Sequence, residues 1–442
     1  MINYNAPSMH VVFLGPSGSG KSTLTGHLLY LSGTNTNDDL DLIKGEMGDS
    51  YDESMKFAYL MDEEQEEREM KKTINTNYKL MGAMMYNLVL IDTPGDPAYA
   101  QNMIGEISKG DVAVLVIPAD LEEFNKGFEN KQYQDYILLS LAMSIEQFVV
   151  VINYKVIKGD QEDENAYNKI KAKLTEWMQL NGINLLMTPF VPVNAFEGDN
   201  LKEESSKFGF YGGGPLEIEL LSQRLPDRYE EKPLRLPISK VIEVDGDNIV
   251  LEGSIETGEL KKGQELYFLP DHQTGTVTDI KFFGEPMEIG DSGNYITFTV
   301  KGKELEGSAL EGKKINEVKR GDVASPFDSL YRAKIAYKFE TRVVISNCDE
   351  GIKEGEEYEM HFNTTYANCT IDRIHYKIKG DSPDYDLSPI KTNESAVLTI
   401  KPQENKVIVD LFKDYPSCGK FAIRGKNGHV AGFGVVRKIS EV

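Results

Sequence analysis

The sequence is poor in the residues that build covalent or metal-bound frameworks. Only three cysteines (Cys348, Cys369 and Cys418) and six histidines occur in 442 residues, and no Cys-x-x-Cys pair is present. Neither a disulfide framework nor a zinc site is therefore expected. No apolar run reaches the roughly 18 residues that cross a bilayer, and the start of the chain lacks the pattern of a signal peptide. We therefore expect a cytoplasmic protein without a membrane segment.

Positive charge is also scarce. The formal net charge is −23, and residues 1–230 hold 36 acidic against 19 basic residues. Such a surface repels phosphate backbones, and no long basic run offsets it, so strong nucleic-acid binding is disfavoured. The densest charged stretch, MDEEQEEREMKK at 61–72, is expected to be a solvated helix with a basic end, with partner recognition as the alternative.

The first half of the chain alternates short apolar runs with amphipathic stretches. The apolar runs lie at 9–15, 86–92, 111–120, 147–153 and 189–195, and helical spacing is found at 21–33, 132–143 and 168–180. Short buried strands that alternate with helices are typical of a doubly wound, mostly parallel α/β sheet. This pattern predicts an α/β domain over residues 1–230.

The second half has a different periodicity. A proline-bearing charged linker near 226–234 is followed by alternating strands with Gly or Asp turns about every ten residues, which is typical of antiparallel barrels. A further break lies near 320–329. We expect two all-β barrel domains, over residues 231–326 and 327–442.

A glycine-rich loop directly follows the first apolar run. GPSGSGKST satisfies G-x-x-x-x-G-K-[ST] and opens a predicted helix. In such loops the backbone N–H groups wrap phosphates, the lysine reaches the outer phosphates, and the Ser hydroxyl binds Mg²⁺. The predicted nucleotide-binding residues here are Gly15, Ser17, Gly18, Ser19, Gly20, Lys21, Ser22 and Thr23.

A second motif, DTPG, ends the buried run at 86–92. Asp92 is the expected partner of Ser22 at the metal, because P-loop enzymes hold Mg²⁺ with the loop hydroxyl and a strand-end carboxylate. Gly95 is expected to be a pivot beside the terminal phosphate. Alone, this tetrapeptide is an ordinary turn, but after a P-loop it favours a nucleotide site.

Nine segments spread over the whole chain carry a resemblance to a known family. They are GKSTLTGHLLY, KFAYLMDEEQEERE, DTPGDPAYAQNMI, AVLVIPA, VPVNAFEGDNL, KPLRLPI, ETGELKKGQ, VKRGDVAS and FKDYPSCGKFAIR. In this order they resemble the elongation factor 1-alpha branch of the translational GTPases, a family that also includes bacterial elongation factor Tu. The resemblance implies a GTPase domain followed by two barrels, with GTP or GDP and Mg²⁺ as ligands.

The resemblance also implies a metal-binding threonine in the first switch segment. That threonine falls on Thr73 of EREMKKTIN, so the implied metal ligands are Ser22, Thr73 and Asp92. The family has Gly-Ile before this threonine, where this chain has Lys71 and Lys72.

The chain departs from the family at the catalytic position. The histidine that follows DTPG in the family, and positions the hydrolytic water there, is replaced by Asp96. A carboxylate beside the terminal phosphate adds like-charge repulsion and cannot donate the hydrogen bond of a histidine. Slow or absent hydrolysis is the expectation, and positioning of the water by Asp96 itself is the alternative.

The base-recognition motif is altered as well. In place of N-K-x-D the chain has Asn153 and Tyr154, with Val156 at the position of the aspartate that accepts hydrogen bonds from guanine. Guanine preference should weaken when that acceptor is missing. Tyr154 either stacks on the base or is a buried structural residue. The last motif appears as Asn194 and Ala195, whose backbone N–H is a candidate donor to the base.

Three functions agree with these features. The first is a divergent GTP-binding paralogue that hydrolyses poorly and acts as a scaffold, with a cytoskeletal or other protein assembly as partner. The second is a working elongation GTPase that delivers aminoacyl-tRNA to the ribosome, and the third is a P-loop NTPase with relaxed base specificity. Candidate partner-contact segments are 61–69 and 302–314.

Overall fold

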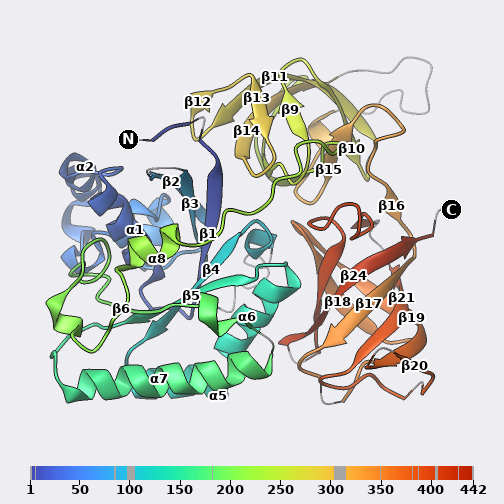
Figure 1. Ribbon diagram of the computed structural model, residues 1–442. Coiled ribbons are helices and arrows are strands. Elements are labelled where there is room, and N and C mark those ends of the chain that lie inside the picture. The colour runs from blue at the N-terminus through green and yellow to red at the C-terminus, as the bar shows by residue number, and fades with distance from the viewer. Residues whose placement is uncertain are drawn as a thin grey trace. The chain divides into compact units, whose positions relative to one another are not determined.

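A computed structural model of the chain describes residues 2–4, 6–83, 86–96, 105–181, 183–302, 315–348, 350–380, 382–386, 388–403, 407–426 and 428–440 (Figure 1). Two compact units are present. The first comprises Met1–Leu141 and Ile145–Pro226, and the second comprises the remaining residues. Of the candidate contact segment at 302–314, all but Gly302 lies outside the described residues. No helix in the described ranges is long and apolar enough to cross a membrane.

The first unit is built on a six-stranded sheet in the order β2-β3-β1-β4-β5-β6. All strands are parallel except β2, which pairs antiparallel with β3. The strands are β1 (Ser8–Leu14), β2 (Asn77–Gly82), β3 (Asn87–Asp92), β4 (Val112–Pro118), β5 (Gln147–Asn153) and β6 (Phe190–Val193). The five predicted strands are confirmed, whereas the antiparallel edge strand was not predicted.

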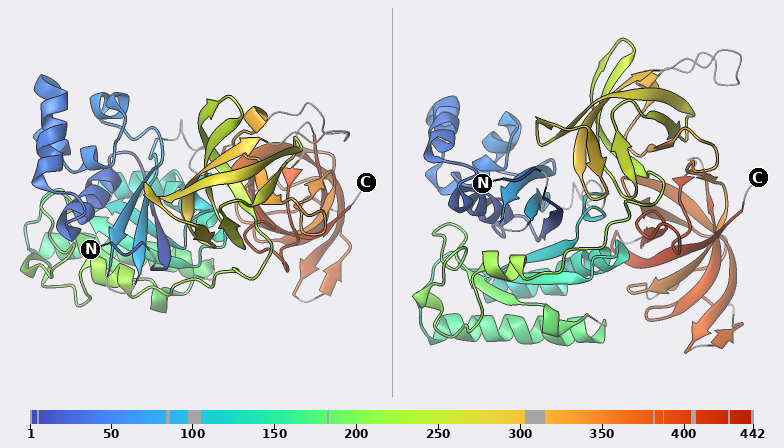
Figure 2. Two further views of the ribbon diagram at one scale, coloured as in Figure 1. Left: turned by 90° about the horizontal axis from the view of Figure 1, so that it is seen from above. Right: turned by 45° about the horizontal axis from the view of Figure 1, so that its top comes forward.

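The helices of this unit are α1 (Lys21–Ser32), α2 (Asn37–Met47), α3 (Gln65–Met70), α5 (Leu121–Glu129), α6 (Gln132–Ala142), α7 (Gln161–Leu180) and α8 (Leu216–Leu221). They cover both faces of the sheet or, like α2 and α3, lie beside it. Leu24 and Leu28 of α1 and Leu216 of α8 share one buried cluster with alternate residues of β1, β4 and β5. Figures 1 and 2 show α7 on the opposite side of the sheet from α1 and α2. The predicted doubly wound α/β domain is therefore confirmed.

The second unit contains two closed six-stranded antiparallel barrels. The first closes in the order β10-β15-β7-β8-β14-β11, and the second in the order β18-β23-β24-β17-β21-β19. The first uses β7 (Leu236–Asp245), β8 (Asn248–Ser254), β10 (Glu265–Leu269), β11 (Gln273–Phe282), β14 (Tyr295–Gly302) and β15 (Val323–Pro326), with β9 (Glu259–Lys261), β12 (Glu285–Pro286) and β13 (Ile289–Asp291) beside it. The second uses β17 (Phe339–Ile345), β18 (Glu357–Phe362), β19 (Thr365–Lys379), β21 (Ser395–Pro402), β23 (Lys420–Arg424) and β24 (Val430–Ile439), with β16 (Ile335–Ala336), β20 (Ser382–Asp384) and β22 (Val407–Ile408). The predicted pair of barrels is confirmed, and their exact boundaries stay a prediction.

A buried ion pair joins segments of the two barrels. Arg235 lies just before β7 and is 3% exposed, and its Nε donates to Asp410 Oδ2 at 2.7 Å while Nη2 donates to Oδ1 at 3.2 Å. Its Nη1 donates to the carbonyls of Leu234 and Tyr331, and its guanidinium lies 4.4 Å from the ring centre of Tyr415. Each guanidinium nitrogen of Arg235 thus donates to at least one acceptor, as a buried cation requires.

One buried carboxylate of the first barrel makes stability depend on pH. Asp322 is 1% exposed, its Oδ2 accepts a hydrogen bond from the Lys319 N–H at 3.1 Å, and burial raises its pKa to about 7. The folded chain therefore holds a proton that the unfolded chain releases near pH 4, so this group stabilises less as pH rises from 4 to 7.

We expect Asp322→Asn to raise the free energy of unfolding at pH 8 by on the order of 2 kcal/mol, and to change it little at pH 4. The asparagine oxygen keeps the hydrogen bond from Lys319 without a buried charge. Urea unfolding at both pH values measures the effect, with the exposed Asp328→Asn as control. Equal gains at both pH values would contradict the assignment.

Candidate functional site

The glycine-rich loop lies where β1 passes into α1. Gly20 has a left-handed backbone (φ 95°), and a Cβ at this position would collide with the side-chain amide of Asn153, so glycine is required for two reasons. Lys21 begins α1 and is buried, and its Nζ donates to the carbonyls of Gly15 at 2.8 Å and Pro16 at 3.2 Å. The lysine is thus folded over the loop that it is expected to serve.

A pocket of about 200 Å³ opens beside this loop. The loop and the start of α1 line one side, and residues 55–73 together with 95–96 line the other. Nine predicted site residues meet here: Ser17, Gly18, Gly20, Lys21, Ser22, Thr23, Thr73, Gly95 and Asp96. Gly95 packs so closely on the loop that a Cβ would approach Lys21 Nζ to 2.5 Å. Two distant motifs therefore converge on one small space.

A chain of hydroxyl groups crosses the pocket. Ser22 Oγ lies 2.8 Å from Thr73 Oγ1, and the Thr73 hydroxyl donates to Asp62 Oδ1 at 3.0 Å. Either hydroxyl of the Ser22 and Thr73 pair can be the donor. Asp62 is buried and was not among the predicted site residues. The only sequence signal for its burial is the apolar stretch 57–61 that precedes it.

Asp92 lies at the base of the site, fully buried. Neither of its carboxylate oxygens makes a hydrogen bond of good geometry to the described residues, although the Ser22 hydroxyl is close enough to lower its pKa. Burial raises its pKa to about 6, although the nearby charge of Lys21 opposes the shift. Burial and the neighbouring Asp92 raise the pKa of Asp62 to about 7, and burial lowers the pKa of Lys21 to about 8. Three ionisable side chains are thus buried close together, and Asp92 is the one that lacks a hydrogen bond of good geometry within the described part of the chain.

These groups fit a Mg²⁺ ion. An octahedral ion with metal–oxygen distances of about 2.1 Å places adjacent ligands about 3 Å apart, close to the 2.8 Å between the hydroxyls of Ser22 and Thr73. The buried carboxylate of Asp92 supplies the negative charge that such an ion needs. Ser22 and Thr73 thus line the pocket, and Asp92 interacts with Ser22 and Lys21 from outside its lining, while their role as metal ligands stays a prediction.

The acidic stretch at 61–72 is only partly a solvated helix. It forms α3, but Glu67 is fully buried, and its Oε1 accepts hydrogen bonds from the N–H groups of Ile74 and Asn75, both at 2.8 Å. The expectation of a wholly solvated face is wrong for Glu67 and Asp62, because both carboxylates turn inward to bind the segment around Thr73. We call the contact of the Glu67 carboxylate with the Ile74 and Asn75 N–H groups the Glu67 clamp. It holds the segment directly after Thr73, and with it the position of Thr73 in the pocket.

The two lysines before Thr73 each have an acidic partner. Lys71 ends α3 in a left-handed conformation (φ 53°), which glycine adopts without strain, and its Nζ lies 2.5 Å from Asp52 Oδ2. Lys72 Nζ lies 3.4 Å from Asp96 Oδ2. The carboxylate at the catalytic position is therefore not an isolated negative charge, which reduces the repulsion expected from the sequence.

Of the predicted base-recognition residues, Asn153 is bonded directly to the glycine-rich loop. Asn153 Nδ2 donates to the Ser19 carbonyl at 2.8 Å, and Asn153 Oδ1 accepts from the Ala195 N–H at 3.0 Å. Asn194 Oδ1 accepts from the N–H groups of Phe196 and Glu197. The Ala195 N–H is thus already engaged by Asn153. These residues and Gly15, Asp92 and Tyr154 lie outside the pocket lining.

Tyr154 and Val156 have opposite environments. Tyr154 is 3% exposed, its hydroxyl donates to the Asp163 carbonyl at 2.8 Å, and its ring packs near Phe208, which favours the structural alternative. Val156 is 73% exposed. Asp163 Oδ2 accepts from the N–H groups of Lys158 and Gly159, both at 2.7 Å, so its carboxylate closes the loop.

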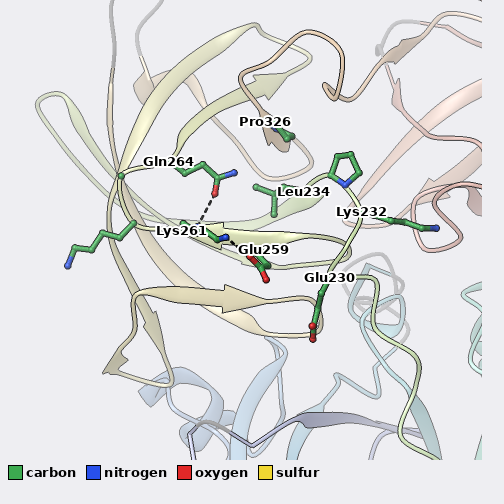
Figure 3. A pocket seen from close by; sticks show the side chains of 10 residues that line it. Glu230, Lys232, Leu234, Glu259, Lys261, Gln264 and Pro326 are labelled. Carbon is green, nitrogen blue, oxygen red and sulfur yellow. Dashed lines mark hydrogen bonds and ion pairs between the residues drawn. The ribbon is translucent and has the colours of Figure 1, made fainter.

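A second hollow, of about 500 Å³, lies in the second unit (Figure 3). Lys261 pairs there with Glu259 at 2.7 Å, and the Lys261 N–H donates to Gln264 Oε1. Figure 3 shows Lys232 directed away from this pair. Because acids and bases are mixed and partly paired, this hollow lacks the concentrated positive charge of a phosphate site. The loop in the first unit remains the better nucleotide site.

Comparisons with known protein families match both halves of the chain. Residues 6–244 match the elongation factor Tu GTP binding domain, and residues 338–437 match the GTP-eEF1A C-terminal domain-like family. Elongation factor 1-alpha of Desulfurococcus mucosus is 32% identical over 437 residues, covering 98% of this chain and 97% of that protein. The Tetrahymena pyriformis protein of the same name is 30% identical over 438 residues, covering 98% of both.

Solved structures agree in fold. The Ski7 GTPase-like domain of S. cerevisiae, bound to GTP, has a TM-score of 0.80 at 18% identity and covers 98% of this chain and 97% of that one. A bacterial selenocysteine-specific elongation factor has a TM-score of 0.66 at 18% identity, covering 97% of this chain and 58% of that one. Both likenesses concern the fold alone.

Proposed function

Because the chain belongs to the elongation factor Tu/elongation factor 1-alpha family of translational GTPases, we propose that it binds GTP and GDP with Mg²⁺ in the pocket beside Lys21. We further propose that it hydrolyses GTP slowly or not at all and acts as a binding module for a protein assembly, such as the cytoskeleton. One observation carries this proposal. The pocket is lined by the residues expected to bind phosphate and Mg²⁺, among them Lys21 and Ser22, but Asp96 occupies the position where the family has its catalytic histidine.

Each residue has a distinct proposed role. Lys21 contacts the outer phosphates, and the ligands Ser22, Thr73 and Asp92 would hold Mg²⁺. Bound Mg²⁺ would neutralise phosphate charge. Asp62 orients the Thr73 hydroxyl. Asn153 would hold the loop in place through its hydrogen bond to the Ser19 carbonyl, and the loop's backbone N–H groups are the proposed donors to the phosphates.

The working elongation GTPase remains the second candidate, because relatives that align over nearly the full chain carry the name elongation factor 1-alpha. The purified full chain separates the two. Titration with fluorescent GTP, GDP and ATP, single-turnover hydrolysis with and without ribosomes, and an aminoacyl-tRNA shift assay are required. Binding without turnover or tRNA supports our proposal. Fast ribosome-stimulated hydrolysis with tRNA binding would replace it, and no nucleotide binding would refute both.

We expect Asp96→His to raise single-turnover GTP hydrolysis by about tenfold, because a histidine can donate a hydrogen bond where Asp96 cannot. The measurement is phosphate release at saturating GTP. Asp96→Gln is the matched control, since it removes the charge without supplying an imidazole. If histidine and glutamine give the same rate, the defect lies elsewhere in the pocket.

We expect Val156→Asp to shift preference toward GTP over ATP by about tenfold, because a carboxylate restores the acceptor for the guanine N–H groups. The exposure of Val156 leaves room for the change. Val156→Asn tests whether charge is needed. Competition titrations with the two triphosphates measure the ratio, and an unchanged ratio would show that the base lies away from residue 156.

A further inference from the structure

Lys72 and Asp96 reach the same end of the nucleotide pocket from two separate segments. Both line it, and their charged groups lie 3.4 Å apart. Asp96 directly follows Gly95, which packs on the loop beside Lys21 Nζ. Their side chains are 49% and 30% exposed, so both can rearrange without disturbing a core. The pair therefore lies at the mouth of the pocket, close to the lysine expected to contact the outer phosphates.

The two residues are also the positions where this chain departs from the family on either side of that mouth. Lys72 stands where the family has isoleucine, and Asp96 where it has histidine. The structure brings the two departures into contact, with opposite charges. A new cation and a new anion that meet at the phosphate end of a pocket form a charge-matched unit, which neither substitution creates alone.

Charge decides which partner Lys72 prefers once a triphosphate is bound. A terminal phosphate carries more negative charge than a carboxylate and offers more acceptor oxygens, so it is the stronger partner for an ammonium group. Lys71, the neighbouring cation, is held 2.5 Å from Asp52. A diphosphate has no terminal phosphate to occupy this end of the pocket, so Lys72 stays paired with Asp96 when a diphosphate is bound.

We propose that Lys72 binds the terminal phosphate of a nucleoside triphosphate, and that Asp96 takes the place of that phosphate when it is absent. The inference rests on the proposed nucleotide binding and deepens it, because it makes residue 72 the group that distinguishes triphosphate from diphosphate.

The test is calorimetric titration of the full chain with Mg²⁺ and either GDP or the non-hydrolysable analogue guanosine 5′-(β,γ-imido)triphosphate. We expect Lys72→Met to weaken binding of the analogue about tenfold and of GDP less than about twofold. Lys72→Arg should retain the discrimination. Lys79→Met is the matched control: Lys79 lies on β2, pairs with Glu63 and does not line the pocket, so both affinities should change less than about twofold.

The role of Asp96 is tested separately. Asp96→Asn should strengthen binding of the analogue about threefold by releasing Lys72, and this gain should vanish when Lys72→Met is also present. An equal loss of both nucleotides in Lys72→Met, or no loss of either, would overturn the inference. If the wild-type chain binds neither nucleotide, the proposed function itself fails. Thermal melting without nucleotide confirms that each variant is folded.

Discussion

Replacing Lys21 by alanine is expected to weaken the binding of both GTP and GDP by at least about a hundredfold. Charge-assisted hydrogen bonds to phosphate contribute about 1.5–3 kcal/mol each, and Lys21 is the buried cation beside the loop. Each 1.4 kcal/mol is a factor of ten in affinity. Titration with fluorescent nucleotide in the presence of Mg²⁺ measures the loss.

The same variant should remain folded, which distinguishes binding from stability. Burial lowers the pKa of Lys21 to about 8, so burying the charged ammonium group has a cost that alanine removes. The melting temperature without nucleotide should therefore stay constant or rise, while the increase caused by added GTP disappears. Lys79→Ala, which removes an equal charge outside the pocket, should keep that increase. A large loss of melting temperature in Lys21→Ala without nucleotide would contradict this argument.

Replacing Arg235 by methionine is expected to lower the free energy of unfolding of the second unit by about 3–5 kcal/mol. Removal of one member of a buried ion pair leaves the other charge without a partner, here Asp410, which accepts two hydrogen bonds from the guanidinium. The double variant Arg235→Met/Asp410→Leu should lose less than the single variant, because no charge is then left buried.

The single tryptophan makes this measurement specific. Trp177 lies in α7 of the first unit, so its fluorescence reports that unit, while far-ultraviolet circular dichroism reports both. Urea unfolding of Arg235→Met should shift the dichroism transition of the barrels to lower urea and leave the tryptophan transition in place. Equal stability of Arg235→Met and the wild-type chain would show that the pair contributes nothing net.

Local patterns were sufficient to predict the main elements. Buried parallel strands appear as continuous apolar runs, and the glycine-rich loop has a fixed spacing, so β1, the loop and α1 could be placed from the sequence. The edge strand β2 could not, because NYKLMG has a half-buried, mixed composition and pairs only through the register of β3. The barrels were predicted from their turns, but which strands close each barrel depends on pairings far apart in sequence.

The part of the site that sequence reasoning missed depends on tertiary structure. Asp62 and Glu67 occur in a run of acidic residues whose most economical interpretation is exposure to water. They are buried because the chain returns to α1 at Thr73. The Thr73 hydroxyl then donates to Asp62, and the amide groups of the next two residues donate to Glu67. The pairing of Lys72 with Asp96 was hidden for the same reason, since the two residues are 24 positions apart.

The Glu67 clamp bears on how the first switch segment moves. Its buried carboxylate accepts hydrogen bonds from two successive amide groups, and a shift of either segment by one residue would leave the carboxylate and both amides unsatisfied. A partly displaced segment therefore has a higher free energy than a segment that is fully bound or fully withdrawn. Withdrawal of the threonine should carry the short helix with it as one piece, so the segment would respond to its ligand in a single step and not by gradual fraying.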